Sequence, residues 1–555
     1  MAGVTEALDS LSADYWEAVL DAGPTEAHLL GFYPTTGRYE DASLAAEDRE
    51  IARLRDFAGR ARALDEAGLD EQGRITREVI VSGATAEADL LEARLKEFGA
   101  DPIFGEQTAL PLILGMLNLP TAEVAEAMTG TLAGIGRWFR DTADRHREGV
   151  ESGRVPAQFA VSGTIAQIEA ALEVPVADDP MVAALQPPEG IDVEAWRSRL
   201  TALVKSSVRP GMAAYRDVLR DVVLPQARPD DRCGLSWLDD GEDTYARTLR
   251  YFTTTEKSAQ EIHDLGLAQI ESLGEEYRAL GPAVVGSDDL AQIFRAMRTD
   301  PALHFTSGDQ LVEASREAMS RAQKAMGDWF EVLPKAPCAV SGTTTGAKAF
   351  YFPPAADGSR GGTFFVNVTD PDSWGTFELE SMAFHEGIPG HHLQLAIAAE
   401  LPDSVPEFRK HLHNAAYAEG WGLYSERLSD EMDLYGGPVD RMGMLSADSL
   451  RASRLVVDTG LHALGWSREQ AVDYMVVNSP MTLAICQAEV DRYVVSPGQA
   501  ASYMIGRLEI QRMRREAEQR QGADFAVKAF HSAVLDSGSL PLDVLDRVVG
   551  ARLPG

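Results

Sequence analysis

The sequence is poor in cysteine, in basic residues and in long apolar runs, and each shortage excludes a class of protein. Its three cysteines include no C-x-x-C pair, which argues against a disulfide framework or a thiolate metal site. The most apolar run, residues 109–117, is much shorter than the ~20 residues that a membrane helix needs. The first residues hold acidic side chains and lack the pattern of a signal peptide. We therefore expect a cytoplasmic protein with no membrane partner.

Positive charge is scarce: 51 Lys and Arg face 86 Asp and Glu, for a formal net charge of −35. Such a surface repels phosphates, so nucleic acid and anionic lipid are poor candidate partners. Aromatic residues make up only 7% of the chain, whereas the helix-forming residues Ala, Leu, Glu and Arg are abundant. The composition predicts a globular protein that is mainly α-helical.

Helical periodicity covers most of the chain. Apolar residues recur at three- and four-residue spacing in residues 47–64, 75–98 and 122–149, with Gly- and Pro-containing breaks between them. The pattern changes between Pro334 and Trp374, where short β-like runs alternate with turn residues. We expect one small antiparallel sheet at about residues 338–368. Its runs are Cys338–Val340, Ala349–Phe352 and Thr363–Val368; the last is expected to be internal, with pairing to an extended peptide as the alternative.

Histidine is unevenly distributed, since five of the 11 histidines lie between residues 385 and 413. His385 and Glu386 begin a segment similar to the zincin signature H-E-x-x-H, in which two helical histidines bind zinc and the glutamate activates water. The position of the second histidine holds Pro389 instead. The segment therefore predicts a metal site with an altered second ligand.

Two later histidines can supply that ligand. On a straight helix His391 lies about 120° away from His385, whereas His392 lies within about 20° but ~10.5 Å along the axis. Pro389 removes a helical hydrogen bond and Gly390 relaxes the backbone, so we expect a kink or π-type bulge that returns one histidine to the metal. His391 is preferred, and His392 stays as the alternative.

A carboxylate for the same metal lies downstream. Glu419 and Glu426 are seven residues apart on a predicted helix, and so lie on one face. Glu419 follows His391 by 28 residues, the spacing expected when the next helix supplies a third zinc ligand. Glu426 is better placed to hold a ligating histidine in position.

These motifs together resemble the bacterial family known as domain of unknown function 885, which is grouped with the glutamate-zincins. The motifs are also similar to those of thimet oligopeptidase, carboxypeptidase Taq and angiotensin-converting enzyme. The resemblance implies two helical lobes around a central channel, with zinc at the channel floor. We expect lobes at 1–230 and 231–555 that form one continuous structural unit. The resemblance rests on residues 385–394, Glu419-Gly420-Trp421, Tyr424, Glu426 and residues 497–503.

Four further residues are weaker candidates. Tyr503 can donate to an oxyanion, as a tyrosine does in the resembling peptidases, or can be a buried structural tyrosine. His462 can reach the substrate, although a core histidine held by Asp458 is slightly favoured. Arg492 and Arg507 can bind a substrate carboxylate, but ion pairs with the many acidic residues are the expected role.

The sequence thus predicts a zinc metallopeptidase for short peptides. His385, His391 or His392, and Glu419 are expected to hold one Zn²⁺, and Glu386 is the expected general base. A zinc-dependent amide or ester hydrolase of a small metabolite is the first alternative. An inactive metal-binding protein is the second. The sequence does not indicate cleavage mode, specificity or oligomeric state.

Overall fold

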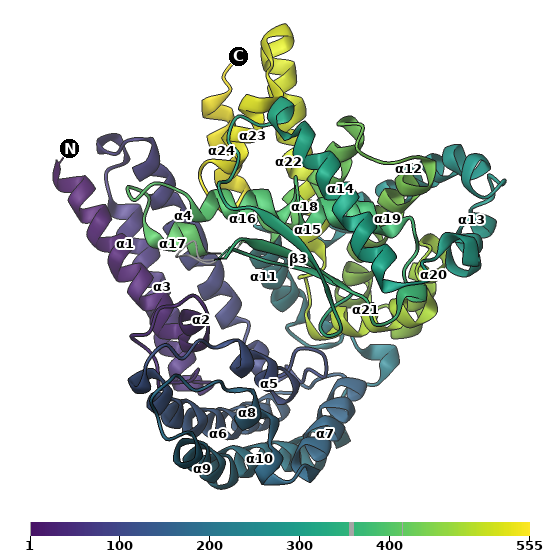
Figure 1. Cartoon of the computed structure of the whole chain (residues 1–555). Coiled ribbons are helices and arrows are strands. Elements are labelled where there is room, and N and C mark those ends of the chain that lie inside the picture. The colour runs from purple at the N-terminus through teal and green to yellow at the C-terminus, as the bar shows by residue number, and fades with distance from the viewer. Residues whose placement is uncertain (1, 355–359, 413) are drawn as a thin grey trace. The chain divides into compact units, whose positions relative to one another are not determined.

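The computed structural model describes residues 2–354, 360–412 and 414–555 (Figure 1). Over these residues the chain is mainly α-helical with one small sheet, which confirms the predicted fold class. His413 and residues 355–359, within the predicted sheet region, lie outside the described residues. The lobes predicted at 1–230 and 231–555, and the channel between them, stay predictions. Two compact units are present: unit 1 is Met1–Leu69, Ile80–Arg247 and Gly465–Glu469, and unit 2 is Asp70–Val79, Thr248–Leu464 and Gln470–Gly555.

Unit 1 is built from helices, and its core follows one helix, α6. The buried positions Met128, Leu132, Ile135 and Phe139 repeat at three- and four-residue spacing, and each is 0% exposed. Burying each such side chain contributes roughly 1.5–3 kcal/mol. The helices wholly or mainly in unit 1 are α1 (Ala2–Ala22), α2 (Pro24–Leu29), α3 (Leu44–Ala63), α4 (Glu71–Glu92), α5 (Glu106–Met116), α6 (Ala122–Glu151), α7 (Gln158–Glu173), α8 (Pro180–Ala184), α9 (Val193–Leu203), α10 (Arg209–Val218) and α11 (Gly241–Thr253).

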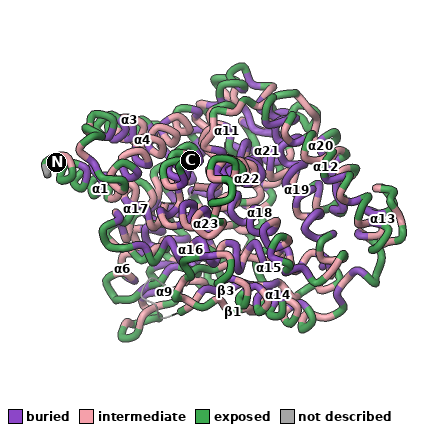
Figure 2. The backbone as a smooth tube through the Cα atoms, turned by 90° about the horizontal axis from the view of Figure 1, so that it is seen from above, coloured by how far each residue is buried: buried purple, intermediate pink, exposed green. Residues whose placement is uncertain are grey.

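Unit 2 holds every candidate site residue of the sequence analysis. Its central helix, α19, is buried along most of its length (Figure 2) and packs against α12, α15 and α22. The helices wholly or mainly in unit 2 are α12 (Ala259–Val284), α13 (Leu290–Thr299), α14 (Gly308–Trp329), α15 (Glu378–Glu386), α16 (His391–Ala399), α17 (Glu407–His411), α18 (Ala415–Glu431), α19 (Pro438–His462), α20 (Arg468–Asn478), α21 (Leu483–Val495), α22 (Ala501–Gln521), α23 (Val527–Leu535) and α24 (Leu542–Arg552).

The sheet of unit 2 has the strand order β1-β3-β2, with β1 at Cys338–Thr343, β2 at Ala349–Phe352 and β3 at Gly362–Asn367. β3 pairs antiparallel with β2 but parallel with β1, so the predicted antiparallel sheet is mixed. The difference arises because β3 inserts between two strands that are neighbours in sequence. β3 is therefore internal, and neither of its edges is open to an extended peptide.

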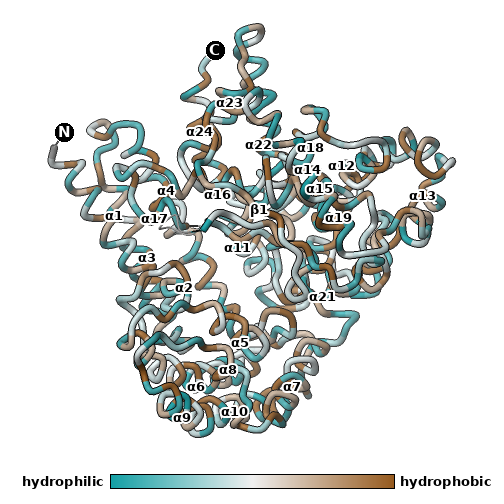
Figure 3. Tube along the Cα trace, viewed as in Figure 1, coloured by the Kyte–Doolittle hydropathy of each residue, from teal (hydrophilic) through white to brown (hydrophobic). Residues whose placement is uncertain are grey.

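The hydropathy of the helices is mixed along their length. No helix of the described residues has both the length and the apolar character that crossing a membrane requires. Figure 3 shows hydrophilic stretches interrupting hydrophobic ones along the chain. This is the pattern of helices that bury one face against a protein core.

Candidate metal centre

The segment after His385 breaks into two helices, where the sequence predicted a kink or bulge within one. α15 ends at Glu386, the turn at 387–390 includes a cis Ile388–Pro389 peptide bond, and α16 begins at His391. Gly390 permits the turn, because a Cβ there would lie 1.9 Å from the His385 carbonyl oxygen. As a result the imidazole rings of His385 and His391 lie close, with centroids 4.7 Å apart.

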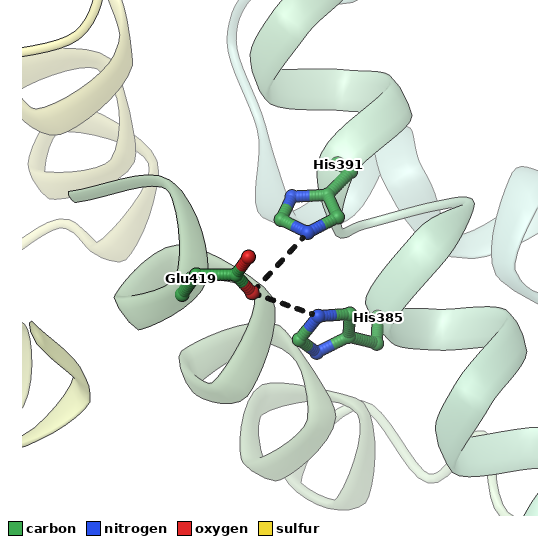
Figure 4. A group of neighbouring side chains, drawn as sticks. All are labelled: His385, His391 and Glu419. Atoms are coloured by element: carbon green, nitrogen blue, oxygen red, sulfur yellow. Dashed lines mark ion pairs between the residues drawn. The ribbon is translucent and has the colours of Figure 1, made fainter. Parts of the chain in front are cut away.

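Three ligand atoms converge at this turn (Figure 4). Glu419 Oε2 lies 3.4 Å from His385 Nε2 and 3.7 Å from His391 Nε2, and one ligand atom from each residue lies within 4.8 Å of the others. Two atoms bound to a tetrahedral zinc at about 2.0–2.1 Å are about 3.4 Å apart. The observed spacings therefore suit a divalent ion such as zinc.

His392 does not join this group. Its Nδ1 lies 2.8 Å from the Tyr351 hydroxyl, and its Nε2 lies 3.0 Å from the Ala336 carbonyl oxygen. Both ring nitrogens are therefore engaged elsewhere, and burial lowers the pKa of His392 so that the ring stays neutral. Of the two histidines that the sequence left open, the geometry brings only His391 to His385 and Glu419.

Glu426 holds His385 from behind. Its carboxylate is 1% exposed; Oε1 lies 2.8 Å from His385 Nδ1, and Oε2 accepts a hydrogen bond of 2.6 Å from the Ser381 hydroxyl. Because Nδ1 donates its proton to Glu426, a neutral His385 has only a lone pair at Nε2, directed at Glu419. The sequence placed Glu426 in this role.

This arrangement leaves two electron-pair donors facing each other at 3.4 Å. Burial alone would lower the pKa of His385, but hydrogen bonds to Glu419 and Glu426 raise it to about 10. Burial works against ionised Glu419, yet hydrogen bonds from His385 and His391 bring its pKa well below the usual range. A proton or a metal ion between the two side chains relieves the repulsion, so the cluster is organised around a positive charge.

Glycines bring the helices of the site together. A Cβ on Gly422 of α18 would lie 2.5 Å from the His385 ring, and a Cβ on Gly506 of α22 would lie 1.9 Å from the Ala416 carbonyl oxygen. The sequence analysis gave these glycines no role. Glycine in a helix interior destabilises the helix by about 1 kcal/mol relative to alanine. Glycines within a predicted helix therefore could have indicated that another element packs closely there.

Glu386 follows His385 at the end of α15 and is half-buried. Its carboxylate makes no hydrogen bond or ion pair with any residue that the structure describes. Its negative charge acts on His385, where it contributes to the raised pKa. The carboxylate is thus close enough to His385 to act on its charge, and it has no partner of its own among the described residues.

Tyr503 lies on α22, beside the close crossing of α22 and α18. Burial raises its pKa, the charge of Glu419 raises it further, and nearby arginines oppose both effects. The guanidinium of Arg454 lies over its ring, 4.5 Å from the centroid. Among the described residues its hydroxyl has no hydrogen-bond partner, and it therefore remains a protonated donor near Glu419.

The other candidates of the sequence analysis have different surroundings. His462 is 0% exposed in the core, and its Nε2 lies 3.0 Å from the Tyr493 carbonyl oxygen. Arg507 is paired with Asp448, and Arg492 with Glu489, at 3.0 Å for the latter pair. None of these three residues belongs to the group of His385, His391 and Glu419.

Solved structures share this fold. A protein from Colwellia psychrerythraea, described as a putative lipoprotein, has a TM-score of 0.91 at 22% identity, covering 99% of both chains. A putative lipoprotein of unknown function from Shewanella oneidensis has a TM-score of 0.77 at 18% identity, covering 98% of this chain and 99% of its own. No curated protein matches the chain.

The predicted cytoplasmic location is wrong in the light of these similar structures, since both are described as lipoproteins. The prediction rested on three absences, namely paired cysteines, a long apolar run and a signal-like pattern in the first residues. Such absences do not determine where a protein is located.

The family comparison covers nearly the whole chain. Residues 24–549 match the family described as bacterial protein of unknown function (DUF885). That span contains His385, His391, Glu386, Glu419 and Tyr503. The chain therefore belongs to the DUF885 family.

Proposed function

We propose that the protein is a zinc-dependent peptidase of the glutamate-zincin type that hydrolyses short peptides. The observation that carries the proposal is the convergence of His385 Nε2, His391 Nε2 and Glu419 Oε2 at ligand spacing. Three protein ligands, two imidazoles and a carboxylate, are the donor set of several catalytic zinc sites, which keep one position for water or substrate. Exposed fractions of 14% for the His391 side chain and 24% for the Glu419 side chain support access from solvent.

A zinc ion held there would supply Lewis-acid chemistry. Glu386 takes the proton of the attacking water and later passes it to the leaving amine, a role that its uncommitted carboxylate supports. Tyr503 donates its hydroxyl hydrogen to the developing oxyanion. Glu426 fixes the His385 ring so that its Nε2 stays directed at the ligand position.

Replacing the base tests the proposal directly. Zinc-loaded wild type is expected to hold one zinc per chain and to cleave a library of acetylated peptides, with products read by mass spectrometry. Glu386→Gln should keep its zinc and lose turnover by a factor of about 10²–10⁴. Glu407→Gln, at an exposed glutamate of the same unit, should leave both unchanged.

Two results would contradict the proposal. Full activity in Glu386→Gln would show that this residue is not the base. A wild-type protein that binds zinc but cleaves no peptide in the library would exclude the peptidase.

A further inference from the structure

Three arginines act on Tyr503. Arg451 and Arg454 come from α19, and Arg492 comes from α21. The guanidinium of Arg454 lies over the Tyr503 ring, 4.5 Å from its centroid, and the charges of all three lower the pKa of Tyr503 against the larger effects of burial and Glu419. The sequence analysis considered only Arg492 of this set.

The carboxylates around these arginines do not balance them. Glu489 Oε2 accepts from Arg454 at 2.8 Å and from Arg492 at 3.0 Å, so one carboxylate serves two guanidiniums. The carboxylate nearest to Arg451 is Glu426, at 3.9 Å, and Glu426 is already bonded to His385 and Ser381. The three guanidiniums therefore share two carboxylates, one of which is also used by the metal centre.

Donors of the cluster are also unused. Nη1 of Arg454 and Nε of Arg451 are buried and have no hydrogen-bond partner in the part of the chain that the structure describes. Their side chains are 8% and 10% exposed. Leaving a buried charged donor unpaired is costly, and an anionic ligand that accepts from these two nitrogens would remove that cost.

Shared carboxylates, unpaired donors and position together identify the ligand's chemistry. We propose that Arg451, Arg454 and Arg492 form a subsite for the C-terminal carboxylate of a peptide. This inference rests on the proposed peptidase function and narrows its substrate class to peptides with a free C-terminus. When the substrate's C-terminal carboxylate is held beside Tyr503, the last peptide bonds of the substrate lie nearest to the metal centre. Cleavage then takes place close to the C-terminal end of the peptide.

Binding tests the subsite without relying on turnover. Full-length zinc-loaded Glu386→Gln protein is equilibrated by dialysis with random acetylated pentapeptides, made once with a C-terminal carboxylate and once with a C-terminal amide. We expect the free acids to be retained about 10- to 100-fold more strongly, as a charge-assisted bidentate contact implies. Mass spectrometry of the retained peptides gives the ratio.

Variants then assign the preference to the arginines. In the same background Arg454→Met and Arg492→Gln should each reduce the acid-to-amide ratio towards one, while Arg512→Gln, in an exposed ion pair of α22, should keep it. Arg492 is the less buried of the two, and thermal melting checks that each variant is folded.

Several outcomes overturn the subsite. Equal retention of acids and amides by the protein with intact arginines excludes it, whatever the variants do. A preference that survives both arginine substitutions shows that the metal itself binds the carboxylate. The peptidase proposal can fail independently of the subsite. If the wild type cleaves no peptide but retains free acids in a way that depends on Arg454, the subsite is supported and the proposed reaction is excluded.

Discussion

Each unit contains a buried cluster of charged groups, and the two clusters are balanced differently. In unit 1, Glu47 is 3% exposed and accepts from Arg94 and from Arg145, both at 2.8 Å. Glu97 in the same cluster pairs with Arg154 at 3.1 Å. Both of these carboxylates therefore have a permanent cation as their partner.

The unit 2 cluster has its carboxylates but no permanent cation. Glu419 contacts His385 and His391, and no lysine or arginine of the described residues lies within ion-pair distance of it. Only a protonated imidazole or a bound ion can compensate that charge. The comparison teaches that the charge balance of a buried cluster, rather than its acidity, distinguishes a structural network from a candidate cation site.

The largest expected effect comes from removing one carboxylate from each cluster. Glu419→Gln should lower the affinity for zinc by more than the about 10- to 100-fold that is typical when a residue supporting a metal ligand is replaced. Glu47→Gln should leave the zinc content unchanged and lower the free energy of unfolding by about 3–5 kcal/mol, because Arg145 loses a buried partner. Metal analysis and urea unfolding of both variants measure this. Equal metal content in the two variants would contradict the comparison.

A smaller effect is expected from Gly422→Ala. The added Cβ would lie 2.5 Å from the His385 ring, and the ring must move away from Glu419. We expect zinc affinity to fall about 10- to 100-fold, as for other changes that misorient a ligand. Chelator competition measures the affinity. Gly550→Ala, where nothing lies within 4 Å of an added Cβ, is the matched control and should keep full affinity; unchanged affinity in Gly422→Ala would mean that His385 is not held by α18.

Local patterns in the sequence predicted much of the fold. The stripe at 122–149 corresponds to α6 at Ala122–Glu151, and the β-like runs correspond to three strands. Strand order was not predictable in this way, because the parallel pairing of β1 with β3 depends on a non-local connection. Periodicity predicts that a segment is a helix or a strand, but it does not predict which other element that segment packs or pairs with.

The candidate site was predictable to a similar degree. Residue types and spacing indicated His385, Glu419 and Glu426, since helical geometry relates them within one or two elements. The choice between His391 and His392 depended on the structure of the turn at 387–390. The helical periodicity that relates residues within one helix does not continue across the break between two helices. Arg454 was missed because it reaches Tyr503 from another helix, and no local signal marks such a contact.

The last expected effect is a pH dependence that separates the two clusters. In the metal-free protein the pKa of His385 is raised to about 10, against about 6.5 when unfolded. Protonated His385 therefore contributes stability that is fully present below pH 6.5 and is lost as pH rises towards 10, by at most about 1.4 kcal/mol per pH unit. In the unit 1 cluster burial would lower the pKa of Arg94, but hydrogen bonds to Glu47 and Asp48 outweigh burial and raise it, so this guanidinium keeps its charge over the same range.

Urea unfolding at pH 7, 8, 9 and 10 checks this difference. The metal-free wild type should lose stability more steeply than metal-free His385→Gln, in which the titrating group is gone. Zinc should flatten the wild-type curve, because a bound ion replaces the proton between His385 and Glu419. Equal slopes in the two metal-free proteins would mean that His385 is not held as a cation by Glu419 and Glu426, and the charge imbalance of unit 2 would then have to be met by some other group.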